Sequence, residues 1–133
     1  MKREELTDLL SAAAIGAGYT FHTGAAHRMN GTLRVYPAAW LEPPVLKSAE
    51  GRTEGDLTYR VTLHMMALPS SAAKEALWTG LEEDALAVAK AAAANPAVRQ
   101  VSGIGCTPGE QSLTAHGEVS VTLTCDITMW YYI

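Results

Sequence analysis

EVSVTLTCDITMWYYI, residues 118–133, carries the strongest structural signal in this chain. Its polar and apolar side chains alternate, and successive side chains of a β-strand point to opposite faces of a sheet. One apolar face and one polar face are typical of an antiparallel sheet that helices cover on one side. The pattern therefore predicts a long strand with one face in the core. The apolar set is Val119, Val121, Leu123, Cys125, Ile127, Met129 and Tyr131, and the polar set is Glu118, Ser120, Thr122, Thr124, Asp126 and Thr128.

Three further stretches also predict strands. Residues 97–105 precede a turn rich in glycine, proline and serine at 106–116, which indicates a hairpin with the last strand. Residues 32–41 and 57–66 alternate in the same way, and they are most simply a second hairpin. The segment that joins these two strands is long and charged, so we expect its tip to be an exposed loop.

Two stretches predict helices. In residues 3–15, Leu6 and Leu10 recur at the spacing of one buried helix face, and Gly16 follows where glycine commonly ends a helix. Residues 72–94 have the longest helical pattern in the chain. A Pro-Ser-Ser start signal precedes this second pattern and an Asn-Pro pair stops it.

These elements predict the fold class. A chain of 133 residues fits one domain, and it is long enough to build one core without disulfides or metals. The order is α-β-β-α-β-β. We therefore expect a single α+β domain with a four-stranded, mainly antiparallel sheet and helices packed on one face.

The composition is that of an ordinary globular protein, with 48% hydrophobic and 18% charged residues. A formal net charge of -4 gives no electrostatic reason to expect nucleic-acid binding. No apolar run approaches the ~20 residues of a membrane-spanning helix, and acidic residues in the MKREELTDLL start argue against a signal peptide. The two cysteines, Cys106 and Cys125, are too few for a disulfide scaffold and indicate reduced thiols in the cytoplasm.

No cluster of residues predicts a reaction, a cofactor or a metal. The GIGCTPG stretch, residues 103–109, lacks the lysine and the following helix of a phosphate-binding loop. No serine or cysteine stands in a nucleophile motif. The spacing of the histidines does not favour the alternative of a zinc site, so their roles stay open. The four histidines are His22, His27, His64 and His116.

The strand that contains YPAAWLEPP, residues 36–44, stops abruptly at Glu42-Pro43-Pro44. Proline cannot donate a hydrogen bond to a neighbouring strand, so this break ends the pairing. Residues 43–56 then form the long exposed loop. Two interpretations of this loop stay open: a contact with a neighbouring protein, or a solvated hairpin tip that keeps the edge from aggregating.

This order of elements resembles the tail terminator and minor tail proteins of long-tailed phages and prophages. The resemblance rests on the short first helix, the strand "VYPAAWLEPP", a charged loop and the strand "LTYRVTLHMMAL". The long helix "ALWTGLEEDALAVAKAAAANPAV" and the final strand "EVSVTLTCDITMWY" complete it. The resemblance extends over nearly the whole chain. It lies in the order of the elements and in the kinds of residues that form them, and it includes no diagnostic motif.

The resemblance implies a structural protein without catalytic residues. Such proteins form a ring, commonly of six subunits, that caps the tail tube and meets the head connector. The implied partners are copies of the chain itself, the tail tube protein and the head-tail connector protein, with no nucleic acid and no membrane. The implied location is the cytoplasm of the bacterial host and then the virion tail.

Eight residues are candidate contacts with another subunit or partner, because they lie on the loop or are aromatic residues near strand ends. The competing function is a small soluble α+β domain that binds a ligand, or acts as an enzyme, through a pocket between sheet and helices. The candidate contacts are Trp40, Glu42, Lys47, Glu50, Arg52, Glu54, Trp130 and Tyr132.

Overall fold

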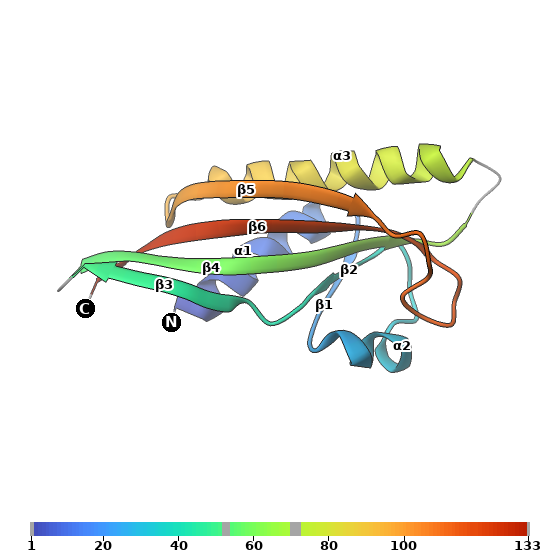
Figure 1. The fold of residues 1–133 in the computed structure, drawn as a ribbon, viewed down its shortest axis with the longest axis horizontal. Coiled ribbons are helices and arrows are strands. Elements are labelled where there is room, and N and C mark those ends of the chain that lie inside the picture. Colours follow the sequence, from blue (N-terminus) through green and yellow to red (C-terminus); the bar gives the residue numbers. More distant parts are fainter. Residues whose placement is uncertain (1, 52–53, 70–72, 133) are drawn as a thin grey trace.

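A computed structural model describes residues 2–51, 54–69 and 73–132 of the chain. It has an α+β fold in which three α-helices and one mixed sheet of six strands are described (Figure 1). The elements are α1 (Lys2–Gly16), β1 (Thr20–Thr23), a 3-10 turn (Ala26–Arg28), α2 (Met29–Thr32), β2 (Ala38–Leu41), β3 (Val45–Gly51), β4 (Glu54–Ala67), α3 (Lys74–Ala93), β5 (Val98–Pro108) and β6 (Val119–Tyr132).

The long strands β4 and β6 form the centre of the sheet, whose order is β1-β2-β4-β6-β5. β3 lies outside this path and pairs with β4 on the same side as β2. β2 pairs with residues 63–66 of β4, and β3 pairs with residues 55–60. The Glu-Pro-Pro break therefore divides one edge of the sheet into two short strands. β1 is parallel to β2, and all other pairs are antiparallel.

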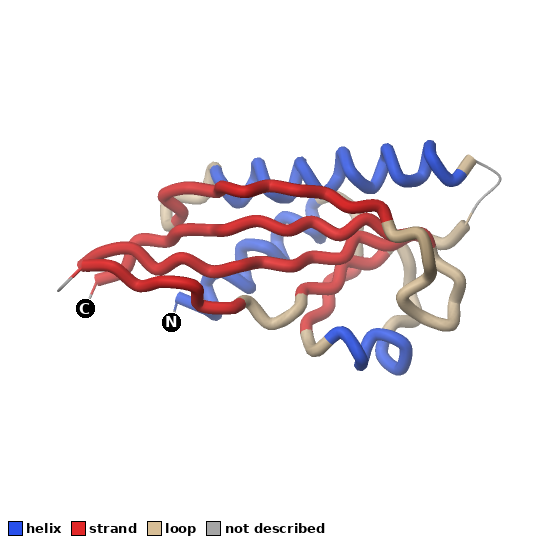
Figure 2. The backbone as a smooth tube through the Cα atoms, viewed as in Figure 1, coloured by secondary structure: helices blue, strands red, loops and turns tan. Residues whose placement is uncertain are grey.

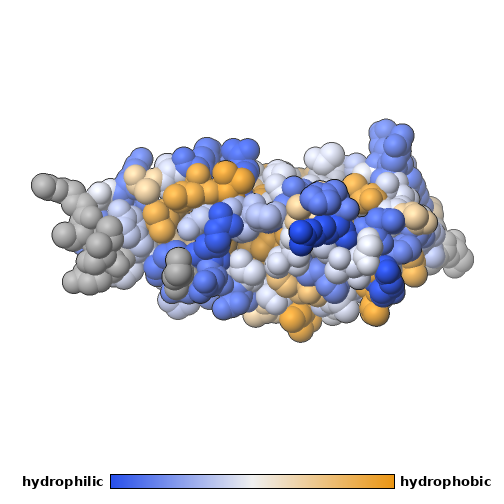
Figure 3. Space-filling view, turned by 90° about the horizontal axis from the view of Figure 1, so that it is seen from below, coloured by the Kyte–Doolittle hydropathy of each residue, from blue (hydrophilic) through white to orange (hydrophobic). Residues whose placement is uncertain are grey.

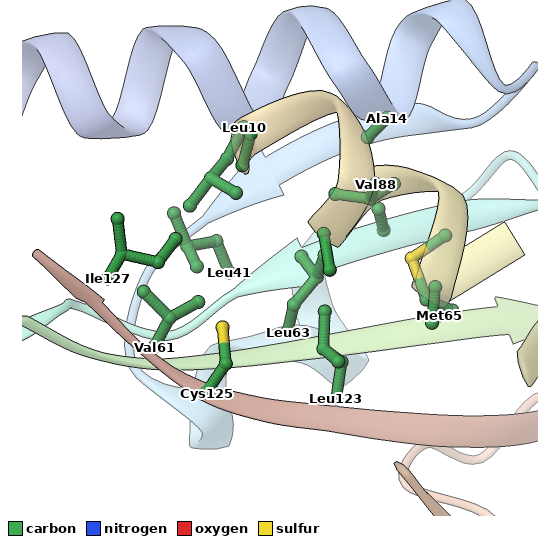
Figure 4. Packing of buried hydrophobic residues seen from close by; sticks show 14 of the residues in the cluster. Leu10, Ala14, Leu41, Val61, Leu63, Met65, Val88, Leu123, Cys125 and Ile127 are labelled. Carbon is green, nitrogen blue, oxygen red and sulfur yellow. The ribbon is translucent and has the colours of Figure 1, made fainter. Parts of the chain in front are cut away.

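The main core lies between the sheet and the helices α1 and α3, which cover the same face of the sheet (Figure 2). Figure 4 shows side chains of the central strands, such as Val61 and Leu123, pointing toward Leu10 of α1 and Val88 of α3. The alternation predicted for β6 is confirmed between residues 121 and 129, where Val121, Leu123, Cys125, Ile127 and Met129 are buried and the residues between them are partly or fully exposed. Glu118 and Ser120 of the predicted polar set are buried instead. The two predicted helices agree with α1 and α3 within two residues at each end.

A second, smaller cluster lies on the opposite face, at the end of the sheet near α2. It consists of Met29, Leu33, Ala38, Trp40 and Met66, and Trp40 Nε1 donates a hydrogen bond of 2.9 Å to the carbonyl oxygen of Gly24. The prediction of helices on one face only is therefore incomplete. The short α2 covers part of the second face because the Trp40 indole on that face is too large and apolar to be left in water.

The predicted count of four strands is wrong, because β1, β2 and β3 are short or irregular. Residues 20–23, for which no element was predicted, form β1. Only Ala38–Leu41 of the predicted strand 32–41 is a strand, and residues 32–37 are not. All four residues of β2 are buried on both faces. Such a strand has no polar face, so alternation cannot mark its boundaries.

The predicted loop 43–56 is also wrong in conformation. It contains β3 and the start of β4, which pair as a hairpin from Val45↔Arg60 to Gly51↔Gly55. All seven residues of β3 are exposed. A strand that is wet on both faces accepts charged side chains as readily as a loop does, so its composition is that of a loop.

The connection between β5 and β6 is held by a buried carboxylate. Glu118 is 3% exposed and accepts hydrogen bonds from Leu113 N at 2.6 Å, Thr114 N at 2.9 Å and Thr114 Oγ1 at 2.6 Å. The same connection reaches α2, where Ala115 N donates to Asn30 Oδ1 at 2.6 Å. These bonds fix an otherwise irregular segment against the rest of the fold.

Candidate functional site

The β3 strand is the most open part of the sheet. It pairs only with β4 among the described strands, and its outer side carries no described partner. Its apolar residues Val45 and Leu46 are 60% and 49% exposed. Figure 3 views the molecule from this side and shows apolar side chains gathered beside hydrophilic ones. An exposed strand with unpaired backbone groups and apolar side chains is a template for pairing with another chain.

Two cations and one carboxylate hold β3 to the centre of the sheet. Lys47 lies at an irregularity of β3 between Leu46 and Ser48, and its Nζ is 2.7 Å from Asp126 Oδ2. Arg60 Nε is 2.8 Å from Asp126 Oδ1. The hydrogen bonds from Lys47 and then Arg60 hold the pKa of Asp126 below its usual range. The ammonium group of Lys47 therefore points over the sheet toward β6.

The lowered pKa of Asp126 predicts a pH dependence of stability. The contribution of this carboxylate is complete above the unfolded-state pKa near 3.9 and is lost as the pH falls through the lower folded-state pKa. Exposed ion pairs contribute about 0.2–1 kcal/mol each. We expect Asp126→Asn to lower the free energy of unfolding at pH 7, measured by urea denaturation, and to lower it less at about pH 2. An equal loss at both pH values would contradict this explanation.

A buried histidine lies where the edge changes from β2 to β3. His64 is 7% exposed; its Nδ1 is 2.8 Å from Thr122 Oγ1 and its Nε2 is 2.6 Å from Glu42 Oε2. A hydroxyl, an imidazole and a carboxylate in series can activate a nucleophile. Here Thr122 lies inside β6 with β4 and β5 on its two sides. These bonds fix Glu42 at the strand break.

The other three histidines lie in different surroundings. His22 stacks on Trp40 with ring centroids 6.1 Å apart. His116 Nδ1 is 2.7 Å from the hydroxyl of Tyr36. His27 lies in the exposed 3-10 turn. Among the described residues, no three His, Cys, Asp or Glu side chains are grouped as a metal site requires.

The two cysteines are free thiols. Cys106 lies opposite Leu123 in the β5–β6 pair, so it is a diagonal neighbour of Cys125. Burial raises the pKa of Cys125 to about 11, with smaller contributions from the charges of Asp126 and Cys106. Cys125 is therefore an unreactive core residue.

One hollow of about 260 Å³ lies beside α3 and is one of the places where the competing ligand-binding function could act. Its lining includes Tyr19, Leu77, Leu81 and Asp84. The hydroxyl of Tyr19 donates to Asp84 Oδ2 at 2.5 Å, and burial followed by this contact raises the pKa of Tyr19. The two polar groups of the hollow thus satisfy each other, which leaves the remaining lining largely apolar.

The eight candidate contacts lie in different parts of the structure. Lys47 and Glu50 lie on β3, Glu54 begins β4 and Glu42 lies at the strand break. Trp130 lies on β6 and is partly exposed. Trp40 is buried beneath the Gly24 carbonyl, so it is unavailable as a surface contact. Arg52 and the side chain of Tyr132 lie outside the described part of the chain.

Sequence reasoning missed the pairing of β3 and the bonds of His64. The signal for the first was present in the apolar pair Val45-Leu46 within a charged segment. The second had no signal, because Glu42, His64 and Thr122 are brought together only by the register of three strands. In the described part of the chain, no helix is both long and apolar enough to cross a membrane.

Comparisons with known proteins leave the family open. A scan against models of known protein families finds no match for this chain. A search of curated proteins likewise finds no significantly similar sequence.

Proposed function

We propose that the protein is a structural subunit of a phage or prophage tail, similar to tail terminators, that assembles with copies of itself into a ring. The observation that carries this proposal is the exposed β3 edge, where Val45 and Leu46 are both exposed on a strand that pairs only with β4 among the described strands. Long exposed edges favour association, and natural monomers commonly blunt them with charges, prolines or cover.

The ring would cap the tail tube and join it to the head, as the resemblance implies. A ring of six subunits, a tail tube protein and a head-tail connector protein are the expected partners. The hairpin of β3 and β4 extends beyond β2 at one end of the molecule (Figure 1). It is therefore placed to reach a neighbouring subunit or the tube. The protein would first be present in the host cytoplasm and then in the virion tail.

The alternative function, ligand binding or catalysis in a pocket between sheet and helices, has weaker support. The hollow beside α3 offers Tyr19 and Asp84 as polar groups, and they already bond to each other. Ligand pockets usually present several polar groups that converge on the ligand. No catalytic residue, cofactor or metal enters the proposal.

The double variant Val45→Lys/Leu46→Lys tests the proposal. Two lysines on the exposed edge are expected to abolish self-association, measured by sedimentation velocity over a range of concentrations, and to prevent joining of purified tails to heads. Ile15→Lys is the control, because Ile15 is 59% exposed but lies on α1 away from the edge. Normal joining by a folded double variant would refute the role of the edge.

A further inference from the structure

We infer that the hollow of about 260 Å³ beside α3 binds an alkylammonium group, which is a protonated primary amine on a short apolar chain. The inference concerns a different surface from the β3 edge, so it goes beyond the proposed ring and does not depend on it. It rests on two observations: the apolar walls of the hollow, and the carboxylate of Asp84, which has no basic partner in the described part of the chain.

Four segments that are distant in the sequence form the walls of the hollow. Tyr19 lies between α1 and β1, Pro37 precedes β2, and Ala67 ends β4. The rest of the lining belongs to α3 and is small or apolar apart from one carboxylate. Walls of this kind favour a ligand with a hydrocarbon body. The lining residues on α3 are Ala76, Leu77, Gly80, Leu81 and Asp84.

Gly80 keeps the hollow open on the side of α3. Glycine is less favourable than alanine in a helix interior. A Cβ at Gly80 would meet nothing within 4 Å, so close packing inside the subunit does not require glycine at this position. Gly80 also lines the hollow, and a larger side chain there would take up part of its space. The glycine therefore leaves room for another molecule.

The carboxylate of Asp84 is partly buried, and only one of its two oxygens has a described partner. The hydroxyl of Tyr19 donates to Asp84 Oδ2 at 2.5 Å. Burial, followed by this hydrogen bond, raises the pKa of Tyr19, so the phenol stays a neutral donor. No described lysine, arginine or histidine forms an ion pair with Asp84. A negative charge that is partly removed from water and has no positive partner favours the binding of a cation.

Asp84 differs in this respect from the other acidic residues that the structure describes. Each of the other three partly buried carboxylates has a basic partner. The fully buried Glu118 accepts three hydrogen bonds instead. Only Asp84 therefore combines partial burial with a single neutral donor. The three pairings are Asp126 with Lys47 and Arg60, Asp56 with Arg99, and Glu42 with His64.

These features select the chemical class of the ligand. A primary ammonium group would donate to Asp84 Oδ1 while Tyr19 holds Oδ2. Its hydrocarbon chain would lie against the apolar lining of α3. A ligand with several polar groups would find few partners, because the phenol already uses its single donor on Asp84. A free alkylamine and a lysine side chain of another protein share the chemistry that fits.

Titration with butylammonium, followed through the backbone amide signals in NMR spectra, tests the inference. We expect a dissociation constant on the order of 1 mM, because only one charged contact and a short chain contribute. The shifts should be largest for residues 76–84. Butanol has a similar chain without the charge and should bind about tenfold more weakly. Equal binding of the two compounds, or no shift in residues 76–84, would overturn the inference.

Two pairs of matched variants locate the site. Asp84→Asn removes the charge but keeps an oxygen that accepts from Tyr19, and it should weaken butylammonium binding about tenfold. Glu83→Gln is its control, because Glu83 is exposed and outside the lining. Gly80→Leu leaves Asp84 unchanged and should abolish binding by filling the hollow, whereas Ala87→Leu, at an exposed position of the same helix, should not. Unchanged binding by folded Asp84→Asn or Gly80→Leu would refute the site.

A blocked lysine, Nα-acetyl-lysine methylamide, distinguishes the two sources of the ammonium group. Binding as strong as that of butylammonium would assign the hollow to a lysine side chain of a partner protein. Binding about tenfold weaker would assign it to a free amine. Failure of both titrations would overturn the inference but leave the proposed ring standing, because Ala67 ends β4 whereas β3 pairs with residues 55–60 of that strand.

Discussion

Replacing Glu118 by alanine is expected to lower the free energy of unfolding by about 3–5 kcal/mol. The carboxylate accepts three hydrogen bonds from Leu113 and Thr114. Alanine would leave the N–H and hydroxyl groups of the buried Thr114 without this partner, and each such buried group is destabilising by about 1–3 kcal/mol. Urea denaturation followed by far-UV circular dichroism measures the effect.

Glu110→Ala is the matched control for Glu118→Ala, because Glu110 lies in the same connection but is exposed. Its only described hydrogen bond accepts from Lys74 through the backbone oxygen, which alanine keeps. We expect this control to change the free energy of unfolding by less than about 0.5 kcal/mol. Similar losses in the two variants would mean that the buried carboxylate does not hold the connection.

Gly55→Ala is expected to disrupt the tip of the β3–β4 hairpin and lower the free energy of unfolding by about 2–3 kcal/mol. A Cβ at Gly55 would overlap the carbonyl oxygen of Glu50, and Gly51 across the pair has φ +111°. Only a backbone shift can relieve this overlap, because Glu50 contributes a backbone atom. Hydrogen exchange of the β3 amides should become faster, and urea denaturation measures the loss.

Gly80→Ala provides a control of opposite sign for Gly55→Ala. Gly80 lies inside α3, and a Cβ there meets no atom within 4 Å. Alanine is favoured over glycine in a helix interior by about 1 kcal/mol, so this variant should be more stable than the wild type. A Gly55→Ala variant with unchanged exchange in β3 would refute the close approach of the two hairpin strands.

The elements that were predicted well from the sequence are those with a long pattern of apolar residues on one face. β6 alternates over most of its length and α3 keeps one apolar stripe, so burial against a single partner layer determines each pattern. The boundaries of α1 follow from Gly16 at its end. These elements supply most of the main core, and the α+β class follows from them.

The elements that escaped prediction lack such a pattern. β2 is buried on both faces, β3 is exposed on both faces, and β1 has only four residues. None of them presents one wet and one dry face, so the period of two that marks a strand is absent. The parallel pairing of β1 with β2 and the bonds of His64 depend on contacts between distant segments. The local sequence contains no pattern from which such contacts can be predicted.

The exposure of residues 45–51 was predicted from the sequence, but their strand conformation was not. Lys47 and Glu50 were expected on an exposed loop and instead lie on an edge strand, with Lys47 at its irregularity. This difference matters for function, because a strand offers backbone hydrogen bonds to a partner whereas a loop offers mainly side chains. The Glu-Pro-Pro break keeps β2 and β3 apart, and the His64–Glu42 contact fixes the break.

Electron microscopy of tail tubes, prepared without this protein and then mixed with the purified chain, tests the ring assignment most directly. The account predicts a ring of subunits at one end of each tube and, after heads are added, joined particles. The Val45→Lys/Leu46→Lys variant should give neither, while Ile15→Lys should behave like the wild type. Bare tube ends and no joined particles with an excess of folded wild-type chain would contradict the assignment.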